Sequence, residues 1–274
     1  MKILVTGANG MIGSKLVEEL QKAGFDVIGI DRVAGKGIIH VDLADKEKLR
    51  EIAREADRII HLAALAHRTP KADLSWERYK HINVDCAKNI FDVAGDRPVL
   101  FISTVDVFGF YDGKEKLTAN SPIKPVSKYG KSKAMAEEEC KKIAKHYSIF
   151  RFSPVYTDEI KRDIQKRYYL WYPFIAYQVG KGTSYEILNI RRAVAEMVAW
   201  CFEKPKNEIK IIKDETPMWT PDYTKVEKAE GRAKIVLYFP QWLVNLGYNV
   251  LRAILGDNEK TFLLNKAVHP FRTA

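Results

Sequence analysis

Short apolar runs alternate with amphipathic stretches through the first half of the chain. Five of these runs predict β-strands, at Lys2–Thr6, Val27–Asp31, Ile38–Val41, Arg58–Leu62 and Val99–Ser103. Between them, apolar residues recur at spacings of three and four, which predicts helices over Met11–Gly24, Asp45–Ala56 and Trp76–Ala94. A helix over Tyr129–His146 and a strand over Ser148–Phe152 continue the alternation. This pattern indicates βαβ units, so we expect an α/β fold with a doubly wound parallel sheet.

The pattern becomes looser beyond Pro154. Helices are predicted over Arg191–Phe202 and Thr220–Ala229, with a short strand over Glu208–Lys213 between them. Lys234–Gly256 is strongly apolar, but polar residues, a proline and a glycine interrupt it, whereas a transmembrane helix needs about 20 predominantly apolar residues. We expect an amphipathic helix there that covers a binding cleft. The C-terminal part is thus predicted to be a smaller, mostly helical region.

Composition narrows the class of protein. The 274 residues are 46% hydrophobic and 29% charged, which is typical of globular proteins and excludes a disordered chain. Cys86, Cys140 and Cys201 have no CxxC spacing, which argues against disulfides and a metal site and fits a reducing compartment. Because the first strand begins at Lys2, we expect no signal peptide, a cytoplasmic location and no stable membrane insertion.

The net charge of +10 has two open explanations. It reflects either a solvated, lysine-rich surface or an attraction for a substrate that carries a diphosphate. The basic residues are interleaved with acidic ones instead of following one stripe, so we expect no nucleic-acid partner.

A glycine-rich segment joins the first predicted strand to the first predicted helix. Its glycines are spaced GxxGxxG from Gly7 to Gly13. Glycines there allow a tight turn, a close approach of the backbone to a pyrophosphate and close packing of the helix on the sheet, and the helix N-terminus offers N–H groups to phosphates. The position of the segment predicts a Rossmann domain that binds a dinucleotide. The residues expected to contact the cofactor are Gly7, Asn9, Gly10, Met11, Ile12 and Gly13.

Asp31 ends the second predicted strand, where a carboxylate can accept hydrogen bonds from a ribose of the cofactor. Because it would repel a 2′-phosphate, Asp31 favours NAD over NADP. Arg32 follows directly and is also a cofactor-binding candidate, although its charge acts in the opposite direction. The alternative interpretation of Asp31 is a turn residue without a ligand.

Tyr129 and Lys133 form a YxxxK sequence on a predicted helix, and residues four apart share a helix face. A free tyrosine has a pKa of about 10, and a neighbouring ammonium favours the phenolate. We therefore expect a lowered pKa, which would let Tyr129 exchange a proton with a substrate hydroxyl. Thr104 follows the strand Val99–Ser103 at the carboxyl edge of the sheet and would orient the substrate oxygen.

Over residues 1–156 the chain resembles the extended short-chain dehydrogenases/reductases, the NAD-dependent epimerase/dehydratase family. The order and spacing of several motifs carry this resemblance. Besides the glycine loop and Asp31, they are Val41-Asp42-Leu43, His61-Leu62-Ala63-Ala64, Asn83-Val84, Ser103-Thr104, Val107-Phe108-Gly109, Tyr129 with Lys133, and Arg151-Phe152-Ser153-Pro154-Val155-Tyr156.

The resemblance implies NAD as the cofactor and a role for each matching residue. Asp42 and Leu43 would flank the adenine, and Ala63 and Ala64 would line the side of the nicotinamide ribose and the diphosphate. Asn83 would support the active-site helix. Phe152 and Ser153 would lie near the nicotinamide, and Leu62 and Ser103 are further cofactor-binding candidates. The implied catalytic residues are Thr104, Tyr129 and Lys133.

The resemblance also implies a domain plan, a substrate and an assembly. Residues 1–156 would form the NAD-binding domain, with 183–204 returning to it, and 157–182 and 205–274 would bind the substrate, a nucleotide-linked sugar. A homodimer is expected through the helices Trp76–Ala94 and Tyr129–His146. Both carry apolar residues beyond the needs of one sheet face, namely Ile82, Ile90, Val93, Met135 and Ile143.

An NAD-dependent sugar-nucleotide epimerase is the first expectation, and other functions stay open. A 4,6-dehydratase would use Asp106 as a base, unless Asp106 is a solvent-facing loop carboxylate. A hydroxyl dehydrogenase or reductase would release reduced cofactor, and a non-catalytic NAD-binding protein would not need the catalytic trio. Arg191 and Arg192 either bind phosphate or lie on the surface where a helix begins.

Overall fold

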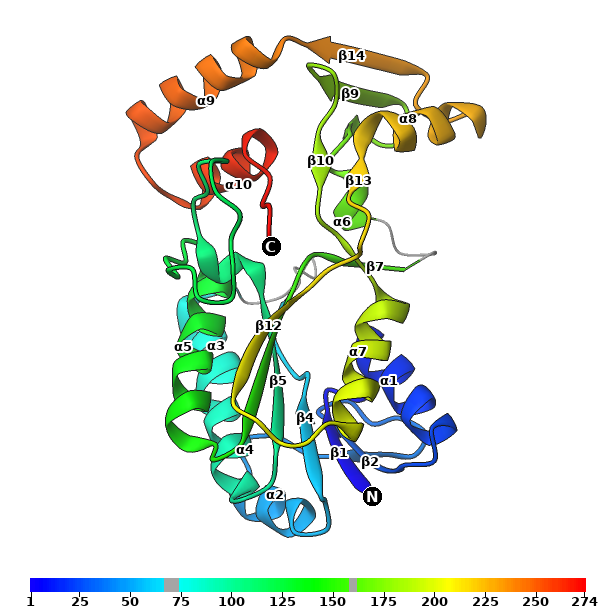
Figure 1. Ribbon diagram of the computed structural model, residues 1–274, viewed down its shortest axis with the longest axis vertical. Helices are drawn as coiled ribbons and strands as arrows, with labels where there is room; N and C mark the ends of the chain where they lie inside the picture. Colours follow the sequence, from blue (N-terminus) through cyan, green and yellow to red (C-terminus); the bar gives the residue numbers. More distant parts are fainter. Residues whose placement is uncertain (67–73, 158–161) are drawn as a thin grey trace. The chain divides into compact units, whose positions relative to one another are not determined.

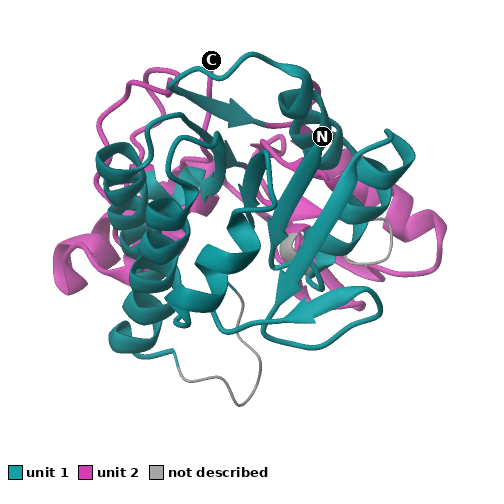
Figure 2. Ribbon diagram, turned by 90° about the horizontal axis from the view of Figure 1, so that it is seen from below, with its two compact units in different colours: residues 1–107, 128–152, 191–212 teal, residues 108–127, 153–190, 213–274 magenta. Residues whose placement is uncertain are grey.

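The computed structural model describes residues 1–66, 74–157 and 162–274, and they form two compact units (Figures 1 and 2). Unit 1 comprises 1–107, 128–152 and 191–212, and unit 2 comprises 108–127, 153–190 and 213–274. These bounds differ from the domain limits expected from the sequence, since 108–127, 153–156 and 183–190 lie in unit 2 and 205–212 lies in unit 1. Contacts within the chain define the units, so the assignment of regions to NAD and to substrate stays a prediction.

Unit 1 is built on a parallel sheet that has seven strands within the described residues, in the order β12-β6-β5-β4-β1-β2-β3. The strands are β1 (Lys2–Thr6), β2 (Asp26–Asp31), β3 (Ile38–His40), β4 (Arg58–His61), β5 (Val99–Thr104), β6 (Tyr147–Phe152) and β12 (Glu208–Ile212). All six neighbouring pairs are parallel. The expected doubly wound Rossmann sheet is confirmed.

Helices cover both faces of this sheet (Figure 1). They are α1 (Met11–Lys22), α2 (Lys46–Ala53), α3 (Trp76–Lys80), the π-helical turn η1 (His81–Asp85), α4 (Cys86–Ala94), α5 (Lys128–Ile143) and α7 (Ile190–Phe202). On one face, Leu49 of α2, Phe91 of α4 and Ala136 of α5 share a core with the strands. Helices α1 and α7 lie on the other face (Figure 1). Burial of apolar side chains on both faces explains why the strands are apolar runs without polar alternation.

Most of the apolar residues that were expected to form a dimer interface pack inside unit 1. Ile90 and Val93 are buried in the core of this unit, and Ile143 packs against the same core. Met135 remains 40% exposed. The homodimer therefore stays a prediction, and it now has less exposed apolar surface on these helices to support it.

Unit 2 combines helices with short strands. Its strands are β7 (Val155–Tyr156), β8 (Tyr169–Trp171), β9 (Ile175–Val179), β10 (Ser184–Tyr185), β11 (Leu188–Asn189), β13 (Met218–Trp219) and β14 (Ile235–Phe239). Its helices are α6 (Arg162–Gln165), α8 (Thr220–Ala229), α9 (Gln241–Leu255) and α10 (Glu259–Val268), and the 3₁₀ turn η2 (Val105–Phe108) ends at its first residue. Strands β14, β9 and β8 form one sheet, which packs on α8 through Tyr168, Tyr223 and Val236.

The expectation of one helix over Lys234–Gly256 is wrong for its first part. Ile235–Phe239 is strand β14, which pairs in parallel with β9, and α9 begins only after Pro240. Pro240 has extended backbone angles, φ −58° and ψ 135°, and proline lacks the N–H that a continuous helix would need. Of the helices that the structure describes, none combines the length and apolar character of a membrane-crossing segment.

A buried ion pair ties α5 to the sheet. Arg151 of β6 donates from Nε and one terminal nitrogen to the two carboxylate oxygens of Glu137, at 3.0 and 2.7 Å, and Ser103 donates to the same carboxylate at 2.5 Å. The side chains of Arg151 and Glu137 are 2% and 0% exposed. Three donors and a cation offset the cost of removing the Glu137 carboxylate from water. Without its cation, the buried charge would leave that cost uncompensated.

Replacing Arg151 with Met should therefore lower the free energy of unfolding by about 3–5 kcal/mol, because Glu137 would stay buried without its cation. The double variant Arg151→Met/Glu137→Met should recover most of this loss, since both charges are then removed. Urea unfolding of the three proteins measures the differences. A single variant as stable as the wild type would contradict this role of the pair.

Candidate functional site

The glycine loop connects β1 to α1 at the carboxyl edge of the main sheet. Gly7 has φ +70°, and a Cβ there would lie 2.8 Å from the backbone nitrogen of Ala63. A Cβ on Gly13 would overlap the carbonyl oxygen of Gly7. Both positions therefore need glycine for close packing. Gly10 is the N-cap of α1 and has no side chain to cap the helix, so N–H groups of the first turn are left for an anionic ligand.

Asp31 links the glycine loop to the end of β2. Its Oδ2 accepts a hydrogen bond from the backbone N–H of Asn9 at 3.0 Å, and its Oδ1 accepts one from Val33 at 2.9 Å. These two donors hold the carboxylate at the rim of a cavity in unit 1. The turn-residue interpretation and the ligand interpretation are thus compatible, because the same carboxylate orders the turn and lines the cavity.

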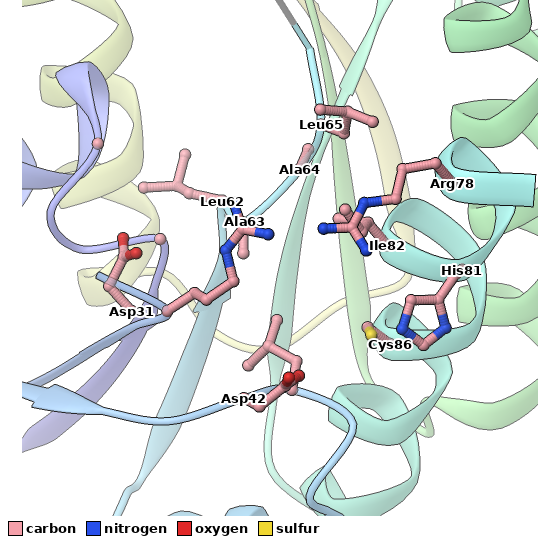
Figure 3. A pocket seen from close by; sticks show the side chains of 14 residues that line it. Asp31, Asp42, Leu62, Ala63, Ala64, Leu65, Arg78, His81, Ile82 and Cys86 are labelled. Carbon is pink, nitrogen blue, oxygen red and sulfur yellow. The ribbon is translucent and has the colours of Figure 1, made fainter. Parts of the chain in front are cut away.

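The cavity has a volume of about 260 Å³ and lies between the carboxyl ends of the strands and the helical segment α3–η1–α4 (Figure 3). The sequence-predicted residues that line it are Gly7, Gly10, Asp31, Arg32, Asp42, Leu43, Leu62, Ala63 and Ala64. They come from four separate strand ends and loops. A groove at this edge, beside a helix N-terminus, is where doubly wound folds bind dinucleotides.

Sequence reasoning missed the helical wall of the cavity. It consists of Arg78, His81, Ile82 and Cys86, and Leu65 of the loop after β4 lines the cavity beside it. Figure 3 shows Arg78, His81 and Cys86 on the helical side and Asp31 and Asp42 opposite them. Arg78, Ile82 and Cys86 follow one another at spacings of four, which is one face of a helix. This spacing was the available signal, and it places a cation opposite the two carboxylates.

Asn83 does not line the cavity but holds two of its walls. Its Oδ1 accepts from Leu65 N–H at 2.7 Å, and its Nδ2 donates to Leu65 O at 3.1 Å and to Ser132 Oγ at 2.9 Å. Ser132 in turn donates to the carbonyl of Tyr129 at 2.8 Å. Asn83 lies in the π-helical turn η1, a deviation that often occurs at functional positions. It connects the strand-end loop with the helix that carries Tyr129, in line with its expected supporting role.

Thr104, Tyr129 and Lys133 all belong to unit 1. Thr104 ends β5, and its hydroxyl accepts a hydrogen bond from the N–H of Asp106 at 3.2 Å. Tyr129 and Lys133 lie one turn apart on α5. The Nζ of Lys133 lies 4.1 Å from the centre of the Phe101 ring, so its ammonium is held by a cation–π contact in the interior.

The electrostatics of this pair differ from the expectation. Burial lowers the pKa of Lys133 from 10.5 to about 7, although Glu137 opposes the change. The pKa of Tyr129 is raised by burial, with smaller contributions from Asp106 and Tyr79, whereas the sequence predicted a lowered value. The reason is that burial disfavours the charged phenolate, an effect that the YxxxK spacing does not reveal.

The remaining cofactor candidates lie outside the residues that line the cavity. Met11, Ile12 and Gly13 form the first turn of α1, and Asn9 contributes its backbone to the Asp31 contact. Ser103 is buried and donates to Glu137, so its hydroxyl belongs to the ion-pair cluster. Phe152 and Ser153 are buried at the end of β6, where unit 1 gives way to unit 2. Their roles toward a cofactor stay predictions.

Arg191 and Arg192 lie at the beginning of α7, in unit 1. Arg192 forms an ion pair with Glu196 one turn later, at 3.6 Å. This contact is typical of a helix surface, and it does not decide between the phosphate-binding and the surface interpretation.

Known proteins resemble the chain in sequence and in fold. The chain is 30% identical over 194 residues to the "Uncharacterized UDP-glucose epimerase YtcB" of Bacillus subtilis (strain 168), covering 60% of each protein. It is 29% identical over 143 residues to the "N-acetyl-alpha-D-glucosaminyl-diphospho-ditrans,octacis-undecaprenol 4-epimerase" of Escherichia coli O157:H7, covering 50% of this chain and 41% of that protein. The first three curated relatives are matched over only 60%, 52% and 38% of their own lengths.

The fold similarity extends further along the chain. The structure of UDP-glucuronic acid 4-epimerase from Bacillus cereus in complex with NAD has a TM-score of 0.72 at 22% identity, covering 88% of this chain and 87% of that one. A likeness at this identity concerns the fold. The sequence model of a family described as "NAD dependent epimerase/dehydratase family" matches residues 3–166, which is more than half of the chain. The chain therefore belongs to the NAD-dependent epimerase/dehydratase family, and NAD is its cofactor.

Proposed function

We propose that this protein is an NAD-dependent epimerase that acts on a nucleotide-linked sugar. The observation that carries the proposal is the presence, in one unit, of the glycine-loop cavity and of the set Thr104, Tyr129 and Lys133. A protein that only binds NAD needs the cavity but not this set. The names of the curated relatives, several of which are UDP-sugar epimerases, support the same substrate class.

The cavity residues fit NAD. The glycine loop and the first turn of α1 would hold the diphosphate, Asp31 a ribose, and Asp42 and Leu43 the adenine. Arg78 on the helical wall adds a positive charge opposite Asp31 and Asp42. Bound there, NAD would supply reversible hydride transfer, with the hydride leaving the sugar carbon and returning to its opposite face, so that no net oxidation would result.

The side chains of this protein would handle the proton. Tyr129 would accept the proton of the sugar hydroxyl as the carbonyl forms. It would return the proton after the keto sugar has rotated in the site and presented its other face. Thr104 would orient the same oxygen. Because the pKa of Tyr129 is raised and that of Lys133 lowered, we infer that Lys133 assists Tyr129 only in its protonated state. The positively charged nicotinamide ring of oxidised NAD, if bound beside Tyr129, would further favour the phenolate.

Asp106 supports a second candidate, a sugar-nucleotide 4,6-dehydratase. It lies two residues after Thr104, is half-buried, and is close enough to contribute to the raised pKa of Tyr129. These properties fit a base for elimination better than a remote surface carboxylate. The test of both candidates is a panel of UDP-, GDP- and dTDP-linked sugars and a polyprenyl-diphosphate sugar, which one relative's name suggests.

The products of this panel separate the activities. An epimerase leaves the mass of the sugar unchanged and alters its NMR spectrum, a dehydratase removes one water, and a dehydrogenase accumulates reduced cofactor. No turnover of any sugar by the NAD-loaded protein would contradict the proposal. Asp106→Asn should abolish a dehydratase but leave most of an epimerase activity.

We expect the protein to bind NAD more tightly than NADP, because a 2′-phosphate would meet the carboxylate of Asp31 at the cavity rim. Asp31→Asn should weaken NAD binding roughly 10- to 100-fold, since a hydrogen bond to a charged group is worth about 1.5–3 kcal/mol. Asp26→Asn, at the other end of β2 and outside the cavity lining, is the matched control and should not weaken NAD binding. Calorimetric titration measures all three. Equal affinity of the wild type for both cofactors would contradict the prediction.

Tyr129→Phe removes only a hydroxyl, so folding and NAD binding should survive while turnover falls roughly 10²–10⁴-fold. Thr104→Ala should cost less, because Thr104 orients the substrate without taking the proton. Lys133→Ala should weaken cofactor binding more than either. Steady-state kinetics on the substrate found in the panel give the order. Near-full activity of Tyr129→Phe would refute the assigned mechanism.

The lowered pKa of Lys133 predicts a pH dependence of stability. Between pH 7 and 10.5 the unfolded chain keeps a proton on this lysine that the folded chain has lost, so the stability of the cofactor-free protein should rise with pH in this window. Lys133→Met lacks this contribution. The difference in urea midpoint between wild type and variant should therefore change in favour of the wild type from pH 7 to pH 10. A constant difference would mean that Lys133 stays charged.

A further inference from the structure

Helix α9 of unit 2 turns its apolar side away from the protein. Trp242, Leu246, Val250 and Ile254 follow one another at spacings of four and form one stripe, and all four are exposed. Trp242 and Ile254 are 66% and 72% exposed. A second stripe beside it carries Leu243, Leu251 and Leu255, which are also exposed. Surface helices of globular proteins normally bury such stripes.

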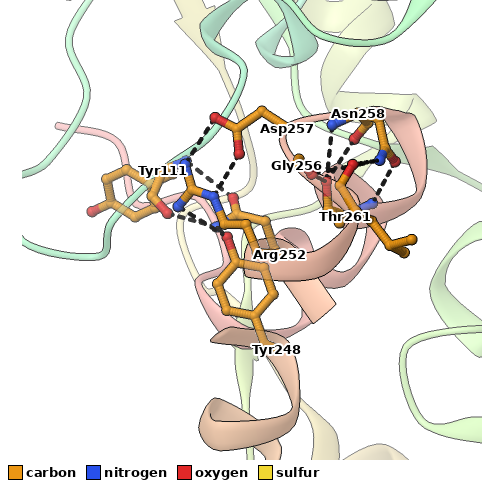
Figure 4. Close-up of polar contacts among 9 residues, drawn as sticks. Tyr111, Tyr248, Arg252, Gly256, Asp257, Asn258 and Thr261 are labelled. Atoms are coloured by element: carbon orange, nitrogen blue, oxygen red, sulfur yellow. Dashed lines mark hydrogen bonds and ion pairs between the residues drawn. The ribbon is translucent and has the colours of Figure 1, made fainter. Parts of the chain in front are cut away.

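The polar side of α9 makes the contacts with the rest of unit 2 (Figure 4). Tyr248 is buried, and its hydroxyl accepts a hydrogen bond from Asn265 of α10 at 3.0 Å. Arg252 pairs with Asp257 at 2.6 Å, and its guanidinium lies 4.6 Å from the centre of the Phe110 ring. These contacts set the rotation of α9 about its axis, so the outward direction of the apolar stripes follows from a specific polar network.

The strand before α9 continues the exposed apolar surface. Ile235 and Leu237 of β14 point to the same side of the sheet as their register partners Ile175 and Tyr177, and both are exposed. Val236 points to the other side, where it packs on the core beneath α8. At the other edge of the sheet, Trp171, the last residue of β8, is 64% exposed. Unit 2 thus presents apolar and aromatic side chains along β14, α9 and the β8–β9 hairpin.

The charged residues within these segments are basic, whereas the flanking Glu230 and Asp257 pair with Arg232 and Arg252. Residues 231–256 contain three basic residues and no acidic one, and the same is true of residues 164–185. Lys181 and Lys234 are exposed. Basic residues beside an exposed apolar helix complement anionic lipid headgroups, and tryptophan and tyrosine are enriched where protein meets the headgroup layer. A second copy of this chain on the same face would bring like charges together.

We propose that α9, together with β14 and the β8–β9 hairpin, docks unit 2 on the surface of an anionic phospholipid bilayer. Helix α9 would lie in the plane of the interface, with Trp242, Leu246, Val250 and Ile254 among the acyl chains and Lys181 and Lys234 at the headgroups. This is peripheral adsorption and does not require a spanning segment. It is independent of the sugar or the reaction, because no residue of the cavity or of the catalytic set takes part.

The test is co-sedimentation of the full chain with vesicles of phosphatidylcholine alone or with phosphatidylglycerol added. The wild type should bind the anionic vesicles, and added salt should weaken the binding. Ile254→Glu should reduce the bound fraction at least about tenfold, because a charge replaces a side chain that would enter the acyl layer. Lys181→Gln/Lys234→Gln should lower binding to anionic vesicles several-fold.

Phe202→Glu is the matched control, because Phe202 is 69% exposed on unit 1 and the charge change is the same. It should bind vesicles like the wild type, and NAD titration of each variant verifies that it is folded. Wild-type protein that stays in the supernatant with anionic vesicles, or Ile254→Glu that binds unchanged, overturns the proposal. So does a lipid-free dimer that Ile254→Glu converts to a monomer in light scattering, since a second copy would then cover this face.

Discussion

The backbone of the glycine loop runs so close to the end of β4 that Gly7 has no room for a side chain, and the cavity depends on this contact. A Cβ on Gly7 would lie 2.8 Å from the nitrogen of Ala63, and the hydroxyl of Thr6 accepts a hydrogen bond from the same N–H at 3.2 Å. This close approach of the loop to Ala63 places the N-terminus of α1 at the mouth of the cavity. Asp31 then accepts a hydrogen bond from the backbone N–H of Asn9, so the glycine loop and the end of β2 are held together at the cavity.

Helix α5 carries both the buried ion pair that stabilises the fold and the buried Lys133 of the proposed site. Glu137 lies one turn after Lys133 and pairs with Arg151, while Lys133 is buried over Phe101. The ion pair fixes α5 on the sheet, and this position buries Lys133 in surroundings that lower its pKa. Protein interiors close-pack around such groups, so any change that loosens α5 would alter the charge state of Lys133 as well as the fold.

Local sequence pattern predicts most of unit 1 but little of unit 2. The strands of the main sheet are apolar runs because both of their faces are buried, and runs of this kind are visible without any knowledge of the fold. The short strands of unit 2 are only two to five residues long, and partners distant in the chain stabilise them. The break at Pro240 has a local signal, whereas the pairing of β14 with β9 does not.

The amino-acid sequence by itself determined the alternating fold of the first half and the glycine loop, and it singled out Asp31 and the proposed set Thr104, Tyr129 and Lys133, because each depends on residue types at short spacings. Only the tertiary structure decided which side chains line the cavity, since Arg78, His81 and Cys86 reach it from a helix distant from the loop. It also reversed the expected pKa shift of Tyr129, because burial acts through surroundings that spacing does not reveal. The outward direction of the apolar stripes of α9 likewise follows from contacts of Tyr248 and Arg252 that exist only in the folded chain.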